Sequence, residues 1–293
     1  MESHKNLFLG ALLSIGSFFC LSSTNTMVKL LGGQIPIFQL LFLQNIVGLV
    51  AMCLICILQK KTLSFYQSNH YGLLLFRTLV GIGIFLFLFI SVQYVSVTNA
   101  TLLVNTAPLF IPFILLFGFA EKIDHRLWAG IIPGFIGIAL ILNPGANIFQ
   151  WHALLALISG GCMAGLYIVL RQLHRNHEPM TRVLVYLFTG SALLTLPFAL
   201  LTWKSPTAHE WFLLGLISAS SFCAQSLMTL SLRYGSPGAL APLCYTAVLF
   251  SLLYDWLLWD NLPTWIAFLG IVLVMVGGVI ALVLERKKLS KPL

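Results

Sequence analysis

The sequence predicts an all-α membrane protein whose ten transmembrane helices form two inverted repeats of five helices (5+5). Three observations carry this prediction: a strongly apolar composition, ten apolar stretches of spanning length, and a match between the two halves of the chain. Charged residues make up 8% of the 293 residues, and the mean hydropathy is +0.97. A water-soluble domain usually carries about a quarter charged residues, so lipid is expected to cover most of this surface.

The ten expected helices follow one another with short connectors. A helix needs roughly 20 mainly apolar residues to cross a bilayer. The expected spans are 7–30, 36–58, 70–93, 98–120, 126–143, 149–171, 182–203, 210–233, 238–259 and 263–285. No connector is long enough for a soluble domain. The first stretch is too long for a signal peptide and lacks a small-residue cleavage site, so we expect it to be the first spanning helix.

The positions of Lys and Arg orient these helices. With a cytoplasmic N-terminus, 13 of the 16 Lys and Arg residues fall in cytoplasmic connectors or tails, and Lys204 falls in an outside connector. Lys29 and Arg77 lie within helices or at their ends. Positive residues concentrate on the cytoplasmic side of membrane proteins. Both termini are therefore predicted to be cytoplasmic, in the inner or plasma membrane.

The two halves of the chain align with each other. Residues 94–121 match residues 233–260 at a constant offset of 139, which places Glu121 opposite Asp260. The following helices align with one extra residue, which pairs glycines: Gly130 with Gly270 and Gly137 with Gly277. The predicted repeats are residues 1–145 and 146–293. Five helices are an odd number, so the second repeat should enter the membrane upside down, as in many secondary transporters.

The first helix carries a polar stripe. Ser14, Ser22, Asn25 and Lys29, with Phe18 between them, follow at spacings of three or four residues and so share one face. Polar groups are costly against lipid, so this face should meet a cavity or another helix. Contact between helices through hydroxyls and amides is the alternative to cavity lining.

The fourth expected helix combines polar residues with two prolines. Thr98, Thr101, Asn105, Pro108 and Pro112 recur at spacings of three and four. Each proline removes a backbone donor and frees a carbonyl group. Kinked helices often carry the binding groups of transporters, and Asn105 is the strongest candidate here. The alternative is that Pro108 only bends the helix.

Asp255 is an ionisable residue about one turn inside the expected outer end of the ninth helix. An intramembrane carboxylate suggests a functional site. It could contact a cationic solute or bind a coupling proton. The alternatives are an acid near the lipid headgroups and a structural partner of Lys29, which should lie at a similar depth on the first helix.

Four residues are expected to act as gates or in a structural role. Arg77 lies about one turn inside the cytoplasmic end of the third helix, where it could attract an anion or extend toward lipid phosphates. Glu121 and Asp260 end their helices at symmetric positions. Pro108 belongs to this group through its kink.

Further polar and aromatic groups could line a central cavity. Tyr167, Gln225 and Tyr245 are the candidates, and ordinary packing is the alternative for each. The glycines at 130 and 134 allow close helix packing. They could also form the seam of a homodimer.

Several function classes are not supported by the sequence. It has no basic domain for nucleic acid, no phosphate-binding loop for ATP and no hydrolase motif. Cys53 and Cys56 form a CxxC pair without the further ligands of a zinc site. We therefore expect no catalytic residue, metal or cofactor.

The chain resembles the EamA-type members of the drug/metabolite transporter superfamily over nearly its whole length. The first half contains Asn99-Ala100, Pro108-Leu109, Glu121 and Gly130, and the second contains Ala239, Pro242-Leu243, Asp260 and Gly270. Lys29 also matches a basic position at the end of the family's first helix. Two positions depart from the pattern: Gln44 stands where an Arg is common, and Asp260 replaces a Glu.

The resemblance implies a secondary active transporter that opens alternately to each side of the membrane. The expected solute is a small polar organic metabolite, such as an amino acid, amine or nucleotide-type molecule. Its expected contacts are Asn25, Lys29, Asn105, Tyr167, Gln225, Tyr245 and Asp255. A channel, a non-transporting scaffold and a lipid-modifying membrane enzyme are the rival functions.

Overall fold

The computed structural model describes residues 2–58, 60, 67–119, 128–142, 151–231, 234 and 240–289. Within these ranges the chain is helical apart from short connectors, and no strand occurs among them. The helices are α1 (Glu2–Leu30), α2 (Ile37–Leu58), α3 (Tyr71–Tyr94), α4 (Val97–Val104), α5 (Ala107–Phe119), α6 (Trp128–Leu142), α7 (Trp151–Arg175), α8 (Met180–Leu201), α9 (Ala208–Ser231), the 3₁₀ helix η3 (Ala241–Tyr245), α11 (Thr246–Trp259) and α12 (Trp265–Leu289). The predicted all-α class is confirmed.

Six helices of the described chain are long and apolar enough to cross a membrane: α1, α2, α3, α7, α8 and α9. Four shorter apolar segments correspond to the remaining expected spans: Val97–Ile111, Trp128–Leu140, Leu243–Trp259 and Trp265–Ile280. Large apolar side chains also cover the exterior, and Leu201 and Trp265 are 83% and 86% exposed. Such a surface is stable only against lipid.

The fourth expected helix, for which the prolines predict a kink, is interrupted. The α4 helix ends at Val104, Asn105 and Thr106 form a turn, and α5 starts at Ala107. Pro108 explains the break, because it has no N–H to donate to the carbonyl of Val104. The expected ninth helix also changes character, from the 3₁₀ helix η3 to α11 at Thr246.

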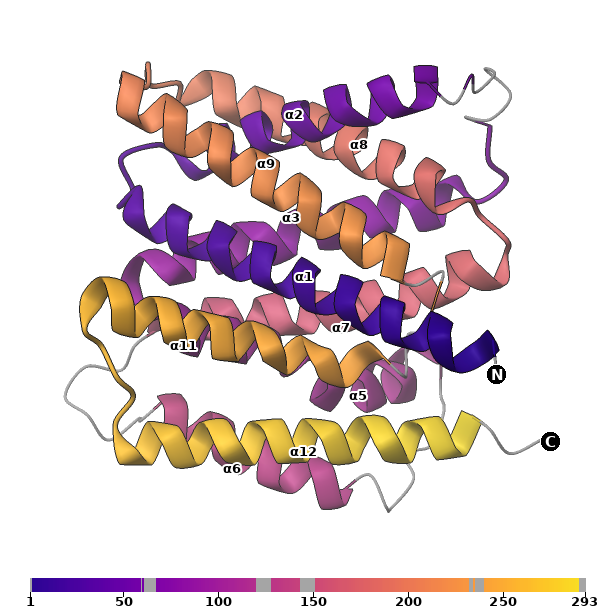
Figure 1. The fold of residues 1–293 in the computed structure, drawn as a ribbon, viewed down its shortest axis with the longest axis vertical. Coiled ribbons are helices and arrows are strands. Elements are labelled where there is room, and N and C mark those ends of the chain that lie inside the picture. Colours follow the sequence, from indigo (N-terminus) through magenta and orange to yellow (C-terminus); the bar gives the residue numbers. More distant parts are fainter. Residues whose placement is uncertain are drawn as a thin grey trace.

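The helices lie side by side in a bundle (Figure 1). The pair α6 and α12 lies at one end of the row, and α2, α8 and α9 lie at the other. Between them are α1, α3, α7 and α11, which enclose the main apolar core. The N-terminal end of α1 and the C-terminal end of α12 lie at the same edge of the bundle.

Glycines bring α6 and α12 into backbone contact. A Cβ on Gly137 would lie 2.6 Å from the carbonyl oxygen of Gly270. A Cβ on Gly277 would lie 2.5 Å from the carbonyl oxygen of Gly130. Both distances are too short for any side chain, so only glycine permits this approach. The same Cβ position on Gly277 lies 2.7 Å from the backbone nitrogen of Gly134, so the packing role predicted for Gly130 and Gly134 is confirmed within a single chain.

Candidate functional site

The side chain of Asp255, on α11, holds the beginning of α4. Its carboxylate accepts hydrogen bonds from the backbone N–H of Val97 (3.2 Å) and Thr98 (2.7 Å) and from the Thr98 hydroxyl (2.6 Å). Ser96 caps the same helix by accepting from the N–H of Asn99 (3.2 Å). The first backbone donors of a helix have no intrahelical partner and attract negative charge. Asp255 supplies both the acceptor and the charge, and it is 1% exposed.

Lys29 completes this contact from α1. Its Nζ lies 3.6 Å from Asp255 Oδ1 and donates to the carbonyl oxygen of Val95 at 3.1 Å. The same ammonium lies 4.6 Å from the centre of the Trp259 ring, a cation–π arrangement. The prediction that Lys29 and Asp255 share one depth is confirmed. The ion pair joins α1, α11 and the connector that precedes α4.

Near this ion pair, a buried polar cluster joins α1, α4 and α11. Ser251 of α11 donates to Thr101 of α4 (3.0 Å) and to Ser22 of α1 (3.2 Å). Asn25 donates to the Thr101 hydroxyl at 3.4 Å, and its Oδ1 is buried without a hydrogen-bond partner. Asn105 donates to the backbone carbonyl of Thr101 at 2.8 Å. Thr101 therefore links both predicted asparagines.

The polar stripe of α1 faces the interior, as predicted. Ser14, Ser22 and Asn25 are fully buried, and Phe18 is 3% exposed. Ser22 donates to the carbonyl oxygen of Ala247 at 2.8 Å, so this part of the stripe connects helices. Ser14 Oγ and Asn25 Oδ1 have no hydrogen-bond partner among the described residues.

The other predicted contact residues lie apart from this cluster. Tyr245 is buried at the end of η3, directly before α11, with its hydroxyl 3.5 Å from the carbonyl oxygen of Val274. Tyr167 packs in a small apolar cluster with Ile111 and Ala164. Gln225, on α9, is partly buried. The structure thus brings Asn25, Lys29, Asn105 and Asp255 together, but not these three.

The predicted gate residues lie in different surroundings. Arg77 is buried on α3. Asp260 is exposed and ends α11 in a left-handed conformation, with φ of 48°. Pro108 is the second residue of α5, directly after the break. Glu121 lies outside the described residues.

Two polar contacts were not predicted from the sequence. Gln44 donates to Ser221 at 2.7 Å, while its Oε1 is buried without a partner. Ser251 lies at the centre of the buried polar cluster. Its position four residues before Asp255, on the same face of the helix, was the available signal.

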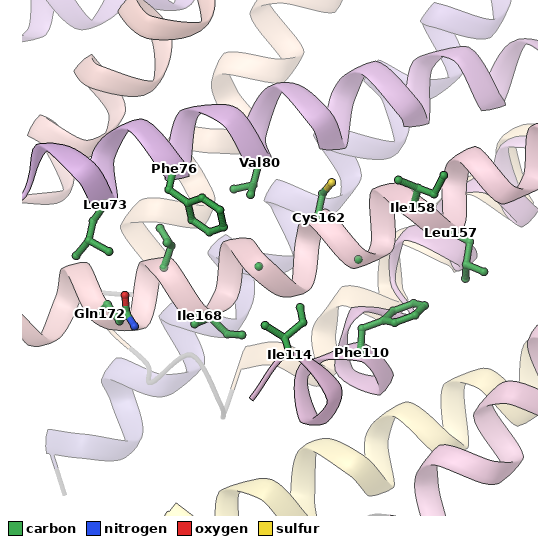
Figure 2. A pocket seen from close by; sticks show the side chains of 13 residues that line it. Leu73, Phe76, Val80, Phe110, Ile114, Leu157, Ile158, Cys162, Ile168 and Gln172 are labelled. Atoms are coloured by element: carbon green, nitrogen blue, oxygen red, sulfur yellow. The ribbon is translucent and has the colours of Figure 1, made fainter. Parts of the chain in front are cut away.

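The structure also contains an apolar groove of about 750 Å³ between α3, α5 and α7. Figure 2 shows Phe76 and Val80 on one side and Ile114 and Phe110 on another, with the Gln172 amide at one end. No predicted contact residue lines this groove. Its apolar walls do not suit a polar solute.

Among the described residues, no group of three His, Cys, Asp or Glu side chains could hold a metal ion. Cys56 is buried and Cys53 is exposed, so the two thiols of the CxxC pair lie in different surroundings.

A sequence profile of the EamA-like transporter family matches residues 8–143 and 150–283. The chain belongs to the EamA-like transporter family. With its apolar helices, it is a multi-pass membrane protein with a transport role, and the predicted inner- or plasma-membrane location fits. Each half of the chain carries one family match, on either side of the connector at 144–149.

Curated relatives of this EamA-like protein include transporters of different solutes. It is 23% identical to a pseudopaline exporter of Pseudomonas aeruginosa, over 92% of this chain and 94% of that protein. It is 24% identical to an S-adenosylmethionine uptake transporter of Rickettsia bellii, over 92% of each chain. A riboflavin transporter of Vibrio cholerae is 27% identical over 78% of each chain. One solved crystal structure matches 99% of each chain with a TM-score of 0.61 at 17% identity, which shows a shared fold.

Proposed function

We propose that this EamA-like protein is a secondary active transporter of a small polar organic metabolite, such as an amino acid, amine or nucleotide-type solute. The observation that carries the proposal is the buried polar contact between α1, α4 and α11, centred on Asp255 and Lys29. Buried ionisable groups are costly in a membrane and usually serve transport. The relatives are named for the transport of organic molecules, with one exporter and one uptake transporter among them.

The proposed architecture is two inverted five-helix repeats, residues 1–145 and 146–293, with cytoplasmic termini. In support, the four most extensive contacts between helices map onto one another when each helix is exchanged for its counterpart in the other half. The contact between α1 and α9 corresponds to the contact between α7 and α3. The contacts between α2 and α8 and between α6 and α12 each correspond to themselves. The reciprocal glycine contacts, 137 with 270 and 277 with 130, follow the same exchange.

The breaks in the fourth and ninth helices also support the repeat. The α5 helix starts at Ala107 and α11 starts at Thr246, which differ by the same offset of 139 that aligns the sequences. Transporters with inverted repeats place such breaks in matching helices of each half. We therefore assign Asn105, at the first break, and Tyr245, at the second, to the solute pathway.

The ion pair between Asp255 and Lys29 closes one end of this pathway in the proposed cycle. A solute or proton that reaches Asp255 must compete with Lys29 and with the donors of Val97 and Thr98. Its binding would release α4 from α1 and α11 and open that end. Asn25, Lys29, Asn105, Tyr167, Gln225, Tyr245 and Asp255 are the proposed solute contacts. Arg77, Pro108, Glu121 and Asp260 are the proposed gate or structural residues.

Binding followed by flux tests this function. Detergent-purified protein is screened by thermal unfolding against amino acids, amines, nucleotides, sugars and S-adenosylmethionine, since a ligand of the folded state raises the melting temperature. Each ligand that binds is then tested for saturable counterflow in proteoliposomes. We expect Asn105→Ala and Asp255→Asn to reduce counterflow at least about tenfold, because the loss of a charged or buried polar contact costs roughly 1.5–3 kcal/mol. Asn261→Ala, at an exposed position, is the matched control.

Two outcomes would contradict the proposal. Flux that never saturates and shows no counterflow favours a channel. A protein that melts cooperatively, but whose melting temperature no ligand of the screen raises, favours a scaffold. Normal counterflow in the Asn105 and Asp255 variants would remove these residues from the site.

A further inference from the structure

Arg77 is a buried cation without an acidic partner in the part of the chain that the structure describes. Its side chain is 4% exposed, and its Nε has no hydrogen-bond partner. Two other cations do have acidic partners: Lys29 lies 3.6 Å from Asp255, and Arg182 donates to Glu178 at 2.8 Å. Glu178 also accepts from Ser68 at 2.5 Å, so its carboxylate is engaged by two donors.

The guanidinium of Arg77 is directed along α3 toward the middle of this helix. Its Nη1 lies 2.9 Å from the position that a Cβ on Gly81 would take, one turn farther along α3. At about 1.5 Å per residue, Gly81 is about 15 Å from the start of this 24-residue helix, which is close to its midpoint. An arginine that reaches for lipid phosphates extends toward the nearer helix end instead. This orientation rules out that role for Arg77 in the observed conformation.

The space for the guanidinium depends on the absence of a side chain at residue 81. Leu187 Cδ1, on α8, would lie 3.0 Å from the same Cβ position. A methyl group at residue 81 would therefore crowd both the guanidinium and α8. Gly81 keeps the charged group of Arg77 at mid-depth.

Other buried polar atoms without partners lie on α3 and on three nearby helices. Among the described residues they are Ser14 Oγ, Asn25 Oδ1, Gln44 Oε1, Ser91 Oγ and Ser226 Oγ. These atoms and Arg77 lie on four helices: α1, α9, α2 and α3. In this order each helix packs against the next, and α3 packs against α1, so the four helices form a closed ring. Buried polar groups are normally hydrogen-bonded, so unsatisfied ones mark places where a polar ligand or water binds. Arg77 is the charged member of this set.

We propose that Arg77, rather than acting as a gate or in a structural role, binds an anionic group, a carboxylate or a phosphate, of the transported solute. The planar guanidinium matches both groups with two parallel hydrogen bonds. An anion would offset the cost of burying an unpaired cation, which is large in a low-dielectric interior. This inference rests on the proposed transport function and assigns a charge class to the solute.

Ligand pairs that differ by one anionic group test the proposal. The pairs are amino acids with their carboxamides, and nucleosides with their 5′-monophosphates, each titrated against the purified full chain by thermal unfolding. In each pair, we expect binding by the compound that carries the carboxylate or the phosphate. Whether amino acids or nucleotides bind then shows which of the two groups Arg77 recognises. Arg77→Met should weaken their binding roughly 30-fold or more, as expected for a desolvated charge pair that loses one partner. Arg77→Lys should retain part of the affinity.

The controls separate the charge from its position. Arg175→Gln removes an exposed charge at the end of α7 and should leave binding unchanged. Gly81→Ala keeps the charge but displaces the guanidinium, so it should weaken binding, whereas Gly72→Ala on the same helix should not, since no atom lies within 4 Å of that Cβ. Without ligand, Arg77→Met should melt no lower than the unmodified protein, because it removes an unpaired buried charge.

The proposal is overturned if no member with a carboxylate or phosphate group binds, if only the members without these groups bind, or if Arg77→Met leaves the affinity unchanged. A lower melting temperature of ligand-free Arg77→Met with unaltered anion affinity would assign Arg77 a structural role. Saturable counterflow of a neutral solute that is insensitive to Arg77 would keep the transport function and reject this site. Anion binding through Arg77 without any flux would keep the site and reject transport.

Discussion

At the scale of single residues, Asp255 connects several helices at once. Its carboxylate accepts from three donors of α4 and pairs with Lys29, so all its bonds serve the contact between three helices in this conformation. The sequence left open whether Asp255 contacts a solute, binds a proton or partners Lys29. The structure contains the contact between Asp255 and Lys29. To contact a solute or bind a proton, Asp255 would have to separate from Lys29.

Breaking this pair should destabilise the folded protein. In Asp255→Asn, Lys29 keeps its charge but loses its partner, and the start of α4 loses a charged acceptor. We expect the free energy of unfolding to fall by roughly 3 kcal/mol, the low end for a broken buried pair, because Lys29 keeps 17% exposure and can reach water. Thermal unfolding in detergent measures the change.

A second substitution tests the cause. Adding Lys29→Met to Asp255→Asn should restore part of the lost stability, because no unpaired charge then remains. Asn261→Ala, at an exposed position just after the same helix, should melt like the unmodified protein. Additive losses in the double variant would argue against coupling between Lys29 and Asp255.

At the scale of helices, the break between α4 and α5 is held by α7. A Cβ on Gly160 would lie 2.6 Å from the carbonyl oxygen of Leu103 and 3.0 Å from the Thr106 hydroxyl. The α7 helix therefore approaches the backbone carbonyls at the break through a residue without a side chain. The next residue, Gly161, faces open space.

Two adjacent glycines provide a matched pair of variants. Gly160→Ala should destabilise the protein by about 1–3 kcal/mol, the usual cost of overpacking, because its methyl group meets backbone. Gly161→Ala should be neutral or slightly stabilising, since alanine is the better helix former and no atom lies within 4 Å of the new Cβ. Melting temperatures of the two variants decide this, and equal values would show that α7 does not pack closely on the break.

At the scale of the whole molecule, the contacts of α1, α4 and α11 form the proposed closure at one edge of the bundle. The predicted orientation places this edge outside the cell, because α1 would start in the cytoplasm. Alternating access requires these contacts to separate during part of the cycle. Loss of the Asp255 charge should favour the open arrangement.

Cysteine labelling can detect this opening and the side on which it occurs. In a variant with the native cysteines replaced by serine, Ser22→Cys is fully buried and should react slowly with a membrane-impermeant maleimide added outside cells. Adding Asp255→Asn should raise that rate several-fold, because a shift of about 1.4 kcal/mol changes a population tenfold. Faster labelling only from the cytoplasmic side of inverted vesicles would reverse the predicted orientation. An unchanged rate from both sides would remove Asp255 as a gate.

The sequence by itself determined the helical membrane class, the number of apolar segments and the internal match of the two halves. Hydropathy and helical spacing are local properties, and they suffice to place Ser14, Ser22 and Asn25 on one face of the first helix, the face that is buried in the fold. The common depth of Lys29 and Asp255 also followed from the length of helices in a bilayer.

Tertiary structure decided which of these residues meet. Asp255 and Thr98 are separated by 157 residues, and no spacing rule brings the start of α4 to α11. The direction of the Arg77 side chain depended on the room left by Gly81 and on the approach of α8, which sequence periodicity does not contain. Contacts between helices depend on packing of distant segments, and their partners are therefore visible only once the chain is folded.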